Sequence, residues 1–121
     1  MVEHLGIVVT ELGDDYVVGT MPVDKRTKQP FGILHGGASV ALAETLASYA
    51  GYLTIDPEKY HVVGVEINAN HLKMAKRGLV TGKCSPIKIG RSTQVWQTEI
   101  TNDDNELVCI SRITLMVLEK K

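Results

Sequence analysis

Residues 37–53 read GASVALAETLASYAGYL, a stretch that is rich in alanine and leucine and contains no proline. Alanine and leucine are strong helix formers, so the stretch predicts a long helix. Its side chains are apolar almost all round, which is typical of a helix in a protein interior. We therefore expect one long central helix that other elements wrap.

The sequence before this helix predicts a β-hairpin followed by a loop. Residues 8–11 and 16–23 are rich in β-branched side chains, and Gly-Asp-Asp at positions 13–15 is typical of a tight turn between strands. The next stretch, DKRTKQPFG at positions 24–32, is charged and contains proline and glycine. We expect the chain to leave the sheet there and form a surface loop, where functional residues are often found.

Four further β-branched segments follow the helix, each bounded by turn residues. They are residues 61–73, 79–87, 92–102 and 106–119. In the first segment the apolar face is formed by Val63, Val65, Ile67 and Ala69. In the last it is formed by Leu107, Cys109, Ile113, Leu115 and Val117. This order predicts an α+β fold, in which an antiparallel sheet of about six strands curls its dry face around the helix.

Length and composition fit one domain. The chain has 121 residues, of which 44% are hydrophobic and 22% charged, and we expect a single domain over residues 1–121. Cys84 and Cys109 are far apart, and neither has metal-ligand spacing, so we expect neither a disulfide scaffold nor a metal site. No segment has the pattern of a signal peptide or a membrane span, which predicts a cytoplasmic protein that does not contact membranes.

Charge is distributed unevenly along the chain. Residues 67–98 carry six basic side chains and no acidic one, whereas the rest of the chain carries seven basic and fourteen acidic side chains. The net charge of −1, with one Trp and one Phe, does not fit a nucleic-acid-binding domain. A basic segment in an acidic domain fits either a site for a small polyanion or a solvated lysine-rich hairpin.

Glu44 lies in the middle of the predicted helix, between Ala43 and Thr45. A carboxylate in an apolar helix loses hydration at a cost unless it has a function, so Glu44 is a candidate general base. Ser48 lies one turn further along the same face and can hold a water molecule or the carboxylate. The alternative is that Glu44 lies on an exposed seam of the helix or pairs with a buried arginine.

His35, Gly36 and Gly37 come directly before the predicted helix. Two glycines at a helix entry leave backbone N–H groups uncovered where the helix dipole favours negative charge, an arrangement that can stabilise an oxyanion. The alternative is that the glycines only turn the chain sharply from loop to helix.

The spacing of these two candidates has a consequence for assembly. Gly36 and Glu44 are eight residues apart, about 12 Å along a helix axis, which is too far for both to contact one carbonyl group. If both act on the same atom they come from different subunits, and the chemistry requires at least a homodimer.

Three stretches together carry a family resemblance: MPVDKRTKQPFGILHGGASVALAETLAS at 21–48, VVGVEINANHL at 62–72 and GRSTQVWQTEI at 90–100. Over nearly the whole chain the sequence resembles hotdog-fold acyl-CoA thioesterases of the phenylacetate and 4-hydroxybenzoyl-CoA type. Within them it is most similar to the 1,4-dihydroxy-2-naphthoyl-CoA thioesterases of menaquinone biosynthesis and the proofreading thioesterases of enterobactin synthesis. The resemblance implies the hotdog fold, a sheet wrapped around one helix, and the hydrolysis of a thioester.

The resemblance also implies roles for individual residues. Glu44 matches the family's catalytic carboxylate, which acts as a nucleophile or as a general base, and Ser48 matches the hydroxyl residue one turn beyond it. Gly36 matches the residue whose N–H polarises the thioester carbonyl. Gln29 and His35 match the glutamine and histidine of the family's active site, the glutamine helping to hold the thioester or the acyl group. In such enzymes these two groups of residues come from opposite subunits, so the resemblance implies a homodimer with shared sites, assembled as a dimer of dimers.

His71 is similar to a histidine that lines the family's acyl site, and the CoA phosphates bind where this chain has Arg91, Ser92 and Thr93. We therefore expect an enzyme that hydrolyses an aromatic or hydroxyaryl acyl-CoA to the free acid and CoA, without a metal or redox cofactor. Close relatives often have a helix before the first strand, whereas here the chain is predicted to enter the first strand almost directly.

Two other functions are open to this fold. A hydratase or dehydratase would need a His-centred site for an enoyl or β-hydroxyacyl chain, and Glu44 with Ser48 argues against it. A non-catalytic acyl-CoA-binding domain would keep the basic groove but would not need Glu44.

Overall fold

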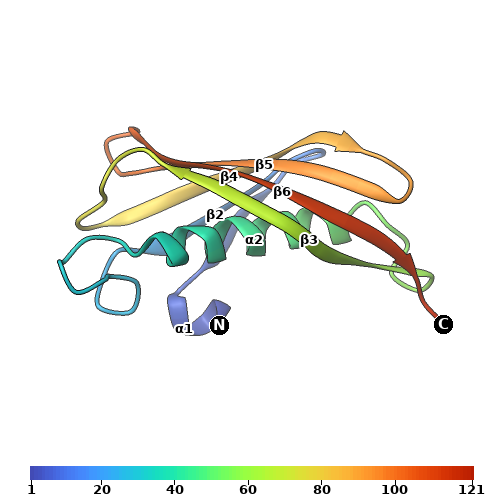
Figure 1. Cartoon of the computed structure of the whole chain (residues 1–121), viewed down its shortest axis with the longest axis horizontal. Helices are drawn as coiled ribbons and strands as arrows, with labels where there is room; N and C mark the ends of the chain where they lie inside the picture. Colours follow the sequence, from blue (N-terminus) through green and yellow to red (C-terminus); the bar gives the residue numbers. More distant parts are fainter.

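A six-stranded antiparallel sheet curves around one long helix in the computed structural model, which describes residues 1–121 (Figure 1). The strands are β1 (Val8–Leu12), β2 (Val17–Pro22), β3 (Tyr60–His71), β4 (Leu79–Ile89), β5 (Thr93–Thr101) and β6 (Leu107–Glu119). The helices are α1 (Val2–Leu5) and α2 (Gly36–Tyr52). The sheet order is β1-β2-β4-β5-β6-β3, so β1 and β3 are its two edges. The predicted α+β fold is confirmed.

The predicted hairpin and central helix are present with nearly the predicted bounds. The turn between β1 and β2 is closed by Gly13 N–H, which donates to the carbonyl of Tyr16 at 2.8 Å. A short helix, α1, precedes the first strand and was not predicted. Gly6, with φ of 75°, ends it in the left-handed conformation that glycine adopts readily. Neither helix combines the length and the apolar character needed to cross a membrane.

The core lies between the concave face of the sheet and one side of α2. Leu42 and Leu46 of the helix are fully buried there. A Cβ atom on Gly82 would lie 2.8 Å from Leu46 Cδ1, so the glycine lets β4 approach the helix closely. The apolar face predicted for the last strand is confirmed, because its buried residues include Cys109, Ile113 and Leu115.

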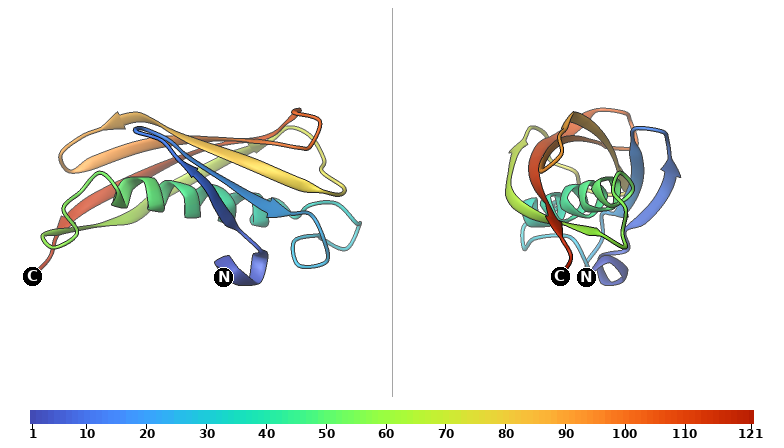
Figure 2. Two further views of the ribbon diagram at one scale, coloured as in Figure 1. Left: turned by 180° about the vertical axis from the view of Figure 1, so that it is seen from behind. Right: turned by 90° about the vertical axis from the view of Figure 1, so that its right-hand side faces the viewer.

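The other side of α2 is open, which corrects the expectation that structure surrounds the whole helix. The end-on view in Figure 2 shows the sheet curving around α2 and leaving one side uncovered. Tyr49 and Tyr52 are 44% and 52% exposed on this helix, and Glu44 is exposed as well. The six strands of one chain reach around only part of the helix. The apolar side chains on its open side therefore remain available for contact with another molecule.

β3 contains a β-bulge at Val65, because Gly64 and Glu66 pair with consecutive residues of β6. The extra residue shifts the alternation of side chains, and Val63 and Val65 are 40% and 56% exposed, whereas Ile67 packs against the core. The prediction that one inner face holds all the alternating apolar residues of this strand is therefore wrong. A period of two cannot reveal a bulge, which reverses the inside and outside positions on one side of it.

Candidate active site

The start of α2 leaves one backbone N–H free. The first four N–H groups of a helix have no acceptor within the helix and need other partners. Here His35 N–H donates to the Thr27 carbonyl at 2.8 Å, and Gly37 N–H donates to His35 Nδ1 at 2.8 Å. Ala38 N–H donates to the His35 carbonyl at 2.9 Å. Gly36 N–H has no acceptor in the chain, so a single donor is left free where the helix dipole is most positive.

The imidazole of His35 is held in place by this capping bond. In a neutral imidazole one ring nitrogen accepts a hydrogen bond and the other donates one. Because Nδ1 accepts from Gly37 N–H, the proton of the neutral ring is on Nε2, which has no partner in the chain. His35 is therefore both the N-cap of α2 and a donor that is free to contact a ligand.

A cavity of about 520 Å³ opens beside Gly36, and we call it the Gly36 hollow. Gln29, His71 and Lys73 also line it. A Cβ atom on Gly36 would lie 3.0 Å from His71 Nε2, so the imidazole packs directly against the glycine. The side-chain Oε1 of Gln29 accepts from Phe31 N–H, which leaves the amide NH₂ of Gln29 free to donate. The hollow thus brings the amide NH₂ of Gln29 and the imidazole of His71 next to the one free backbone N–H.

Glu44 and Ser48 line a different cavity, which we call the α2 groove. It has a volume of about 700 Å³, follows the open side of α2 and is also lined by Tyr49 and Tyr52. A Cβ atom on Gly64 of β3 would lie 3.1 Å from Glu44 Oε2, so the glycine makes room for the carboxylate. Gly64 was not among the residues predicted from the sequence, although a glycine inside a strand is a known signal of close approach by another group.

The two groups of predicted site residues are therefore separate within one chain. The Gly36 hollow and the α2 groove share no lining residue. This placement agrees with the distance of about 12 Å expected from eight residues of helix between Gly36 and Glu44.

Arg91 and Ser92 lie at the other end of the molecule. They line a cavity of about 380 Å³ together with Thr54, which follows the C-terminal end of α2. Thr93 begins β5, pairs with Met116 of β6 and does not line this cavity. Within one chain these residues are separated from the Gly36 hollow by the length of α2.

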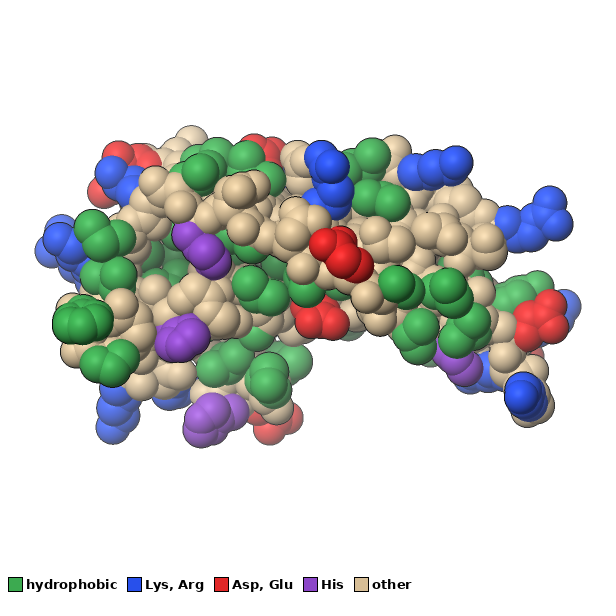
Figure 3. All heavy atoms as spheres, in the orientation of Figure 1, with side chains coloured by type: hydrophobic (Ala, Val, Ile, Leu, Met, Phe, Trp, Pro, Cys, Tyr) green, Lys and Arg blue, Asp and Glu red, His purple; other side chains and the backbone are tan.

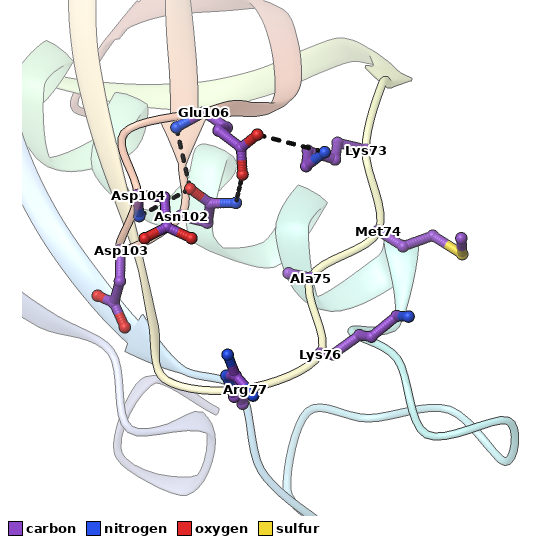
Figure 4. A pocket seen from close by; sticks show the side chains of 9 residues that line it. All are labelled: Lys73, Met74, Ala75, Lys76, Arg77, Asn102, Asp103, Asp104 and Glu106. Carbon is purple, nitrogen blue, oxygen red and sulfur yellow. Dashed lines mark hydrogen bonds and ion pairs between the residues drawn. The ribbon is translucent and has the colours of Figure 1, made fainter.

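The largest of these cavities, about 720 Å³, is lined mainly by charged side chains of residues 73–77 and 102–106 (Figure 4). Lys73 Nζ lies 3.4 Å from Glu106 Oε2, and the Asn102 amide donates to the same carboxylate. None of the predicted site residues lines this cavity. Nowhere in the chain do three or more His, Cys, Asp or Glu side chains come together as a metal site would require.

Comparisons with known proteins point to one family. The family model of the Thioesterase superfamily matches residues 31–109. The 1,4-dihydroxy-2-naphthoyl-CoA hydrolase of Escherichia coli is 53% identical over 118 residues, which are 98% of this chain and 86% of that protein. The proofreading thioesterase EntH of Cronobacter sakazakii is also 53% identical over 118 residues, 98% of this chain and 85% of that protein. A crystal structure of a thioesterase from Haemophilus influenzae matches with a TM-score of 0.94 and 53% identity, over 98% of this chain and 82% of that one. These matches confirm the resemblance found in the sequence.

Proposed function

The chain belongs to the thioesterase superfamily of hotdog-fold thioester hydrolases, and from this premise we propose that it hydrolyses an aromatic or hydroxyaryl acyl-CoA, similar to 1,4-dihydroxy-2-naphthoyl-CoA. The name of the Escherichia coli relative supports this substrate class. Tyr49 and Tyr52 support it too, because they give the α2 groove flat apolar surfaces that suit an aryl group. Relatives named as thioester hydrolases favour this function over a hydratase or a non-catalytic binding domain.

The free N–H of Gly36 is the observation that carries the mechanism. A thioester carbonyl oxygen bound at this donor gains negative charge as the carbon is attacked, and a preorganised N–H stabilises that charge. The Gln29 side chain has an unpaired donor in the same hollow and holds the thioester in place. His35 lines a neighbouring cavity with Gly37 and Ala41, and its capping bond to Gly37 N–H fixes the helix start that carries the Gly36 N–H.

Glu44 supplies the attacking group, either as the base that takes a proton from water or as the nucleophile itself. In the first case a water oxygen bonds to the carbonyl carbon, the C–S bond breaks, and the proton goes to the CoA thiolate. Ser48 lies one turn beyond Glu44 in the same groove, where its hydroxyl orients the water or the carboxylate. Hydrolysis changes no oxidation state, so the proposed reaction needs no redox cofactor, and a carboxylate and an N–H can perform it without a metal.

A homodimer completes this site. β3 is an edge strand of 12 residues with a row of unpaired backbone groups, and such an edge readily pairs with a second copy. Val63 and Val65 of this strand are exposed, and the open side of α2 lies next to it. Figure 3, which looks onto β3 as Figure 1 does, shows hydrophobic side chains on this face of the molecule. Antiparallel pairing of two β3 strands about a two-fold axis turns the partner's helix against this one. The partner's Glu44 is then directed toward the Gly36 hollow of this chain.

The same two-fold axis places the CoA end of the substrate. Arg91 and Ser92 lie near the Tyr60 end of β3, whereas the Gly36 hollow lies near its His71 end. Antiparallel pairing brings opposite ends of the two β3 strands together, so the partner's Arg91 and this chain's Gly36 are at the same end of the dimer. We assign the CoA phosphates to Arg91 and Ser92 on this basis, and place Thr93 at the margin of that site.

Replacement of Glu44 tests the proposed function. We expect Glu44→Gln to lower kcat for benzoyl-CoA by at least 1,000-fold, on the order of the loss seen when a catalytic group is removed, while circular dichroism and KM change little. Glu99→Gln is the matched control, because Glu99 is exposed on β5 and lines neither the Gly36 hollow nor the α2 groove. Near-normal turnover of Glu44→Gln contradicts the mechanism, and faster hydrolysis of hexanoyl-CoA than of benzoyl-CoA by the wild type contradicts the substrate class.

A further inference from the structure

Ser39 is an almost fully buried residue whose hydroxyl makes no hydrogen bond within the chain. The residue lies in the first turns of α2 and is only 1% exposed, yet its Oγ makes no hydrogen bond within the chain. Two comparable buried hydroxyls are bonded: Thr27 Oγ1 donates to the Pro22 carbonyl at 2.7 Å, and Ser111 Oγ donates to the Asn68 carbonyl at 2.9 Å. Hydroxyl groups of residues this deeply buried normally have a hydrogen-bond partner, so the unbonded Ser39 hydroxyl needs an explanation.

The hydroxyl of Ser39 opens into the Gly36 hollow. Every side-chain nitrogen or oxygen that is fully enclosed in this chain has a hydrogen-bond partner. The Ser39 oxygen has none, so it is not fully enclosed and must contact open space. Ser39 lines the hollow together with Gly36 and His71. Its small exposed area therefore faces the cavity that holds the free N–H.

Helix geometry aims Ser39 and Gly36 in the same direction. Residues three apart lie on the same face of a helix, and side chains tilt toward the helix N-terminus, where the N–H groups also point. A serine in a helix often donates to the carbonyl four residues earlier. Here that carbonyl belongs to His35 and accepts from the backbone N–H groups of Ala38 and Ser39, while the Ser39 hydroxyl does not bond to it.

We propose that Ser39 is a further catalytic residue, whose hydroxyl donates a hydrogen bond to the thioester oxygen beside the Gly36 N–H as that oxygen becomes negatively charged. The inference rests on the proposed reaction at the Gly36 hollow. Two donors on one side of a helix then bind the oxygen, one from the backbone and one from a side chain. The hydroxyl has no other hydrogen bond to give up when the substrate binds.

The test compares Ser39→Ala with the wild type. Loss of one oxyanion donor lowers kcat by about 100-fold or more, and we expect this loss with a KM within threefold of the wild type. Thermal stability should be unchanged or higher, because the hydroxyl makes no bond in the folded chain and alanine is the better helix former. Ser111→Ala is the matched control: it makes the same chemical change at a residue that is 2% exposed, but removes a hydroxyl that is bonded. That variant should lose thermal stability and keep the wild-type kcat.

Two results overturn the role of Ser39. One is a kcat of Ser39→Ala within threefold of the wild type. The other is a lower kcat accompanied by a fall in thermal stability as large as that of Ser111→Ala, which indicates a structural role. Each ratio is measured on the thioester that the wild type hydrolyses fastest among benzoyl-CoA, hexanoyl-CoA and acetyl-CoA. If the proposed acyl group is wrong, the wild type does not hydrolyse benzoyl-CoA fastest. If the proposed role of Ser39 is wrong, the ratio of the Ser39→Ala kcat to the wild-type kcat stays close to one on whichever thioester is used.

Discussion

Replacement of Gly36 by alanine separates the role of this residue in the site from its role in the helix. The new Cβ atom would lie 3.0 Å from His71 Nε2 and 3.1 Å from His71 Cε1. Ordinary contacts begin at 3.4 Å, so the imidazole has to move by about 0.4 Å, the difference between 3.4 and 3.0 Å. The methyl group also enters the Gly36 hollow, where the thioester oxygen is proposed to bind. Since misplacement by about 1 Å can cost 100-fold, we expect kcat/KM to fall by at least about tenfold, or about 1.4 kcal/mol of transition-state stabilisation.

Stability should move in the opposite direction. Gly36 does not have a positive φ, so alanine fits its backbone conformation. Glycine loses more backbone freedom on folding than alanine, and the replacement should stabilise the fold by up to about 0.5–1 kcal/mol. Hydrolysis is followed by the release of the CoA thiol, and stability by urea unfolding. Gly51→Ala is the contrasting control, because its Cβ would lie 2.6 Å from Leu115 Cδ1 in the core and should destabilise the protein.

A second variant identifies the cause of the loss. In a His71→Ala background the imidazole is absent, so Gly36→Ala should cost less activity there than in the wild type. A Gly36→Ala enzyme with wild-type kcat/KM would refute the placement of the thioester oxygen at this N–H.

Gly64→Ala should lower kcat with little loss of stability, because its Cβ would lie 3.1 Å from Glu44 Oε2 and displace a flexible carboxylate. Unchanged kinetics would show that the position of this carboxylate is not critical. Arg91→Ala should raise KM for benzoyl-CoA more than it lowers kcat, because a phosphate contact far from the thioester binds ground state and transition state alike. An equal rise in KM for a truncated thioester without the nucleotide would exclude Arg91 from the CoA site. Cys84 and Cys109 should not react with Ellman's reagent at pH 8 until the protein is unfolded, because burial raises the pKa of the Cys84 thiol to about 11 and also raises that of Cys109. Rapid labelling of the native protein would contradict their burial.

The parts of the fold that follow from local pattern could be predicted from the sequence. The alanine-rich stretch predicted α2 because helix propensity summed over many residues is informative. The alternation in β6 predicted its buried face because that strand is regular where it faces the helix. The bulge at Val65 could not be predicted, since an extra residue in one strand is defined by its pairing with another strand.

Site residues, too, could be predicted only where a local pattern in the sequence marks them. Glu44 and Gly36 could be identified because a charge in an apolar helix and a pair of glycines at a helix entry are visible in the sequence. Ser39 gave no such signal, because its importance depends on a hydroxyl that lacks a partner in three dimensions. The prediction that the same chain covers all sides of α2 was wrong. Apolar composition shows that a surface is to be covered, but it does not show whether the same chain or a second copy covers it.

Complementation between two inactive variants tests the central claim, that each site combines Gly36 of one subunit with Glu44 of another. Glu44→Ala and Gln29→Ala chains are mixed, partly denatured and refolded together, and hydrolysis of benzoyl-CoA is measured. In a random mixture about half of the dimers are heterodimers, and each of these has one site with both changes and one intact site. If each site is shared between two subunits, activity returns to about a quarter of the wild-type value. No recovery in a preparation proven to contain heterodimers would contradict it, because a site contained in one chain cannot be restored by mixing.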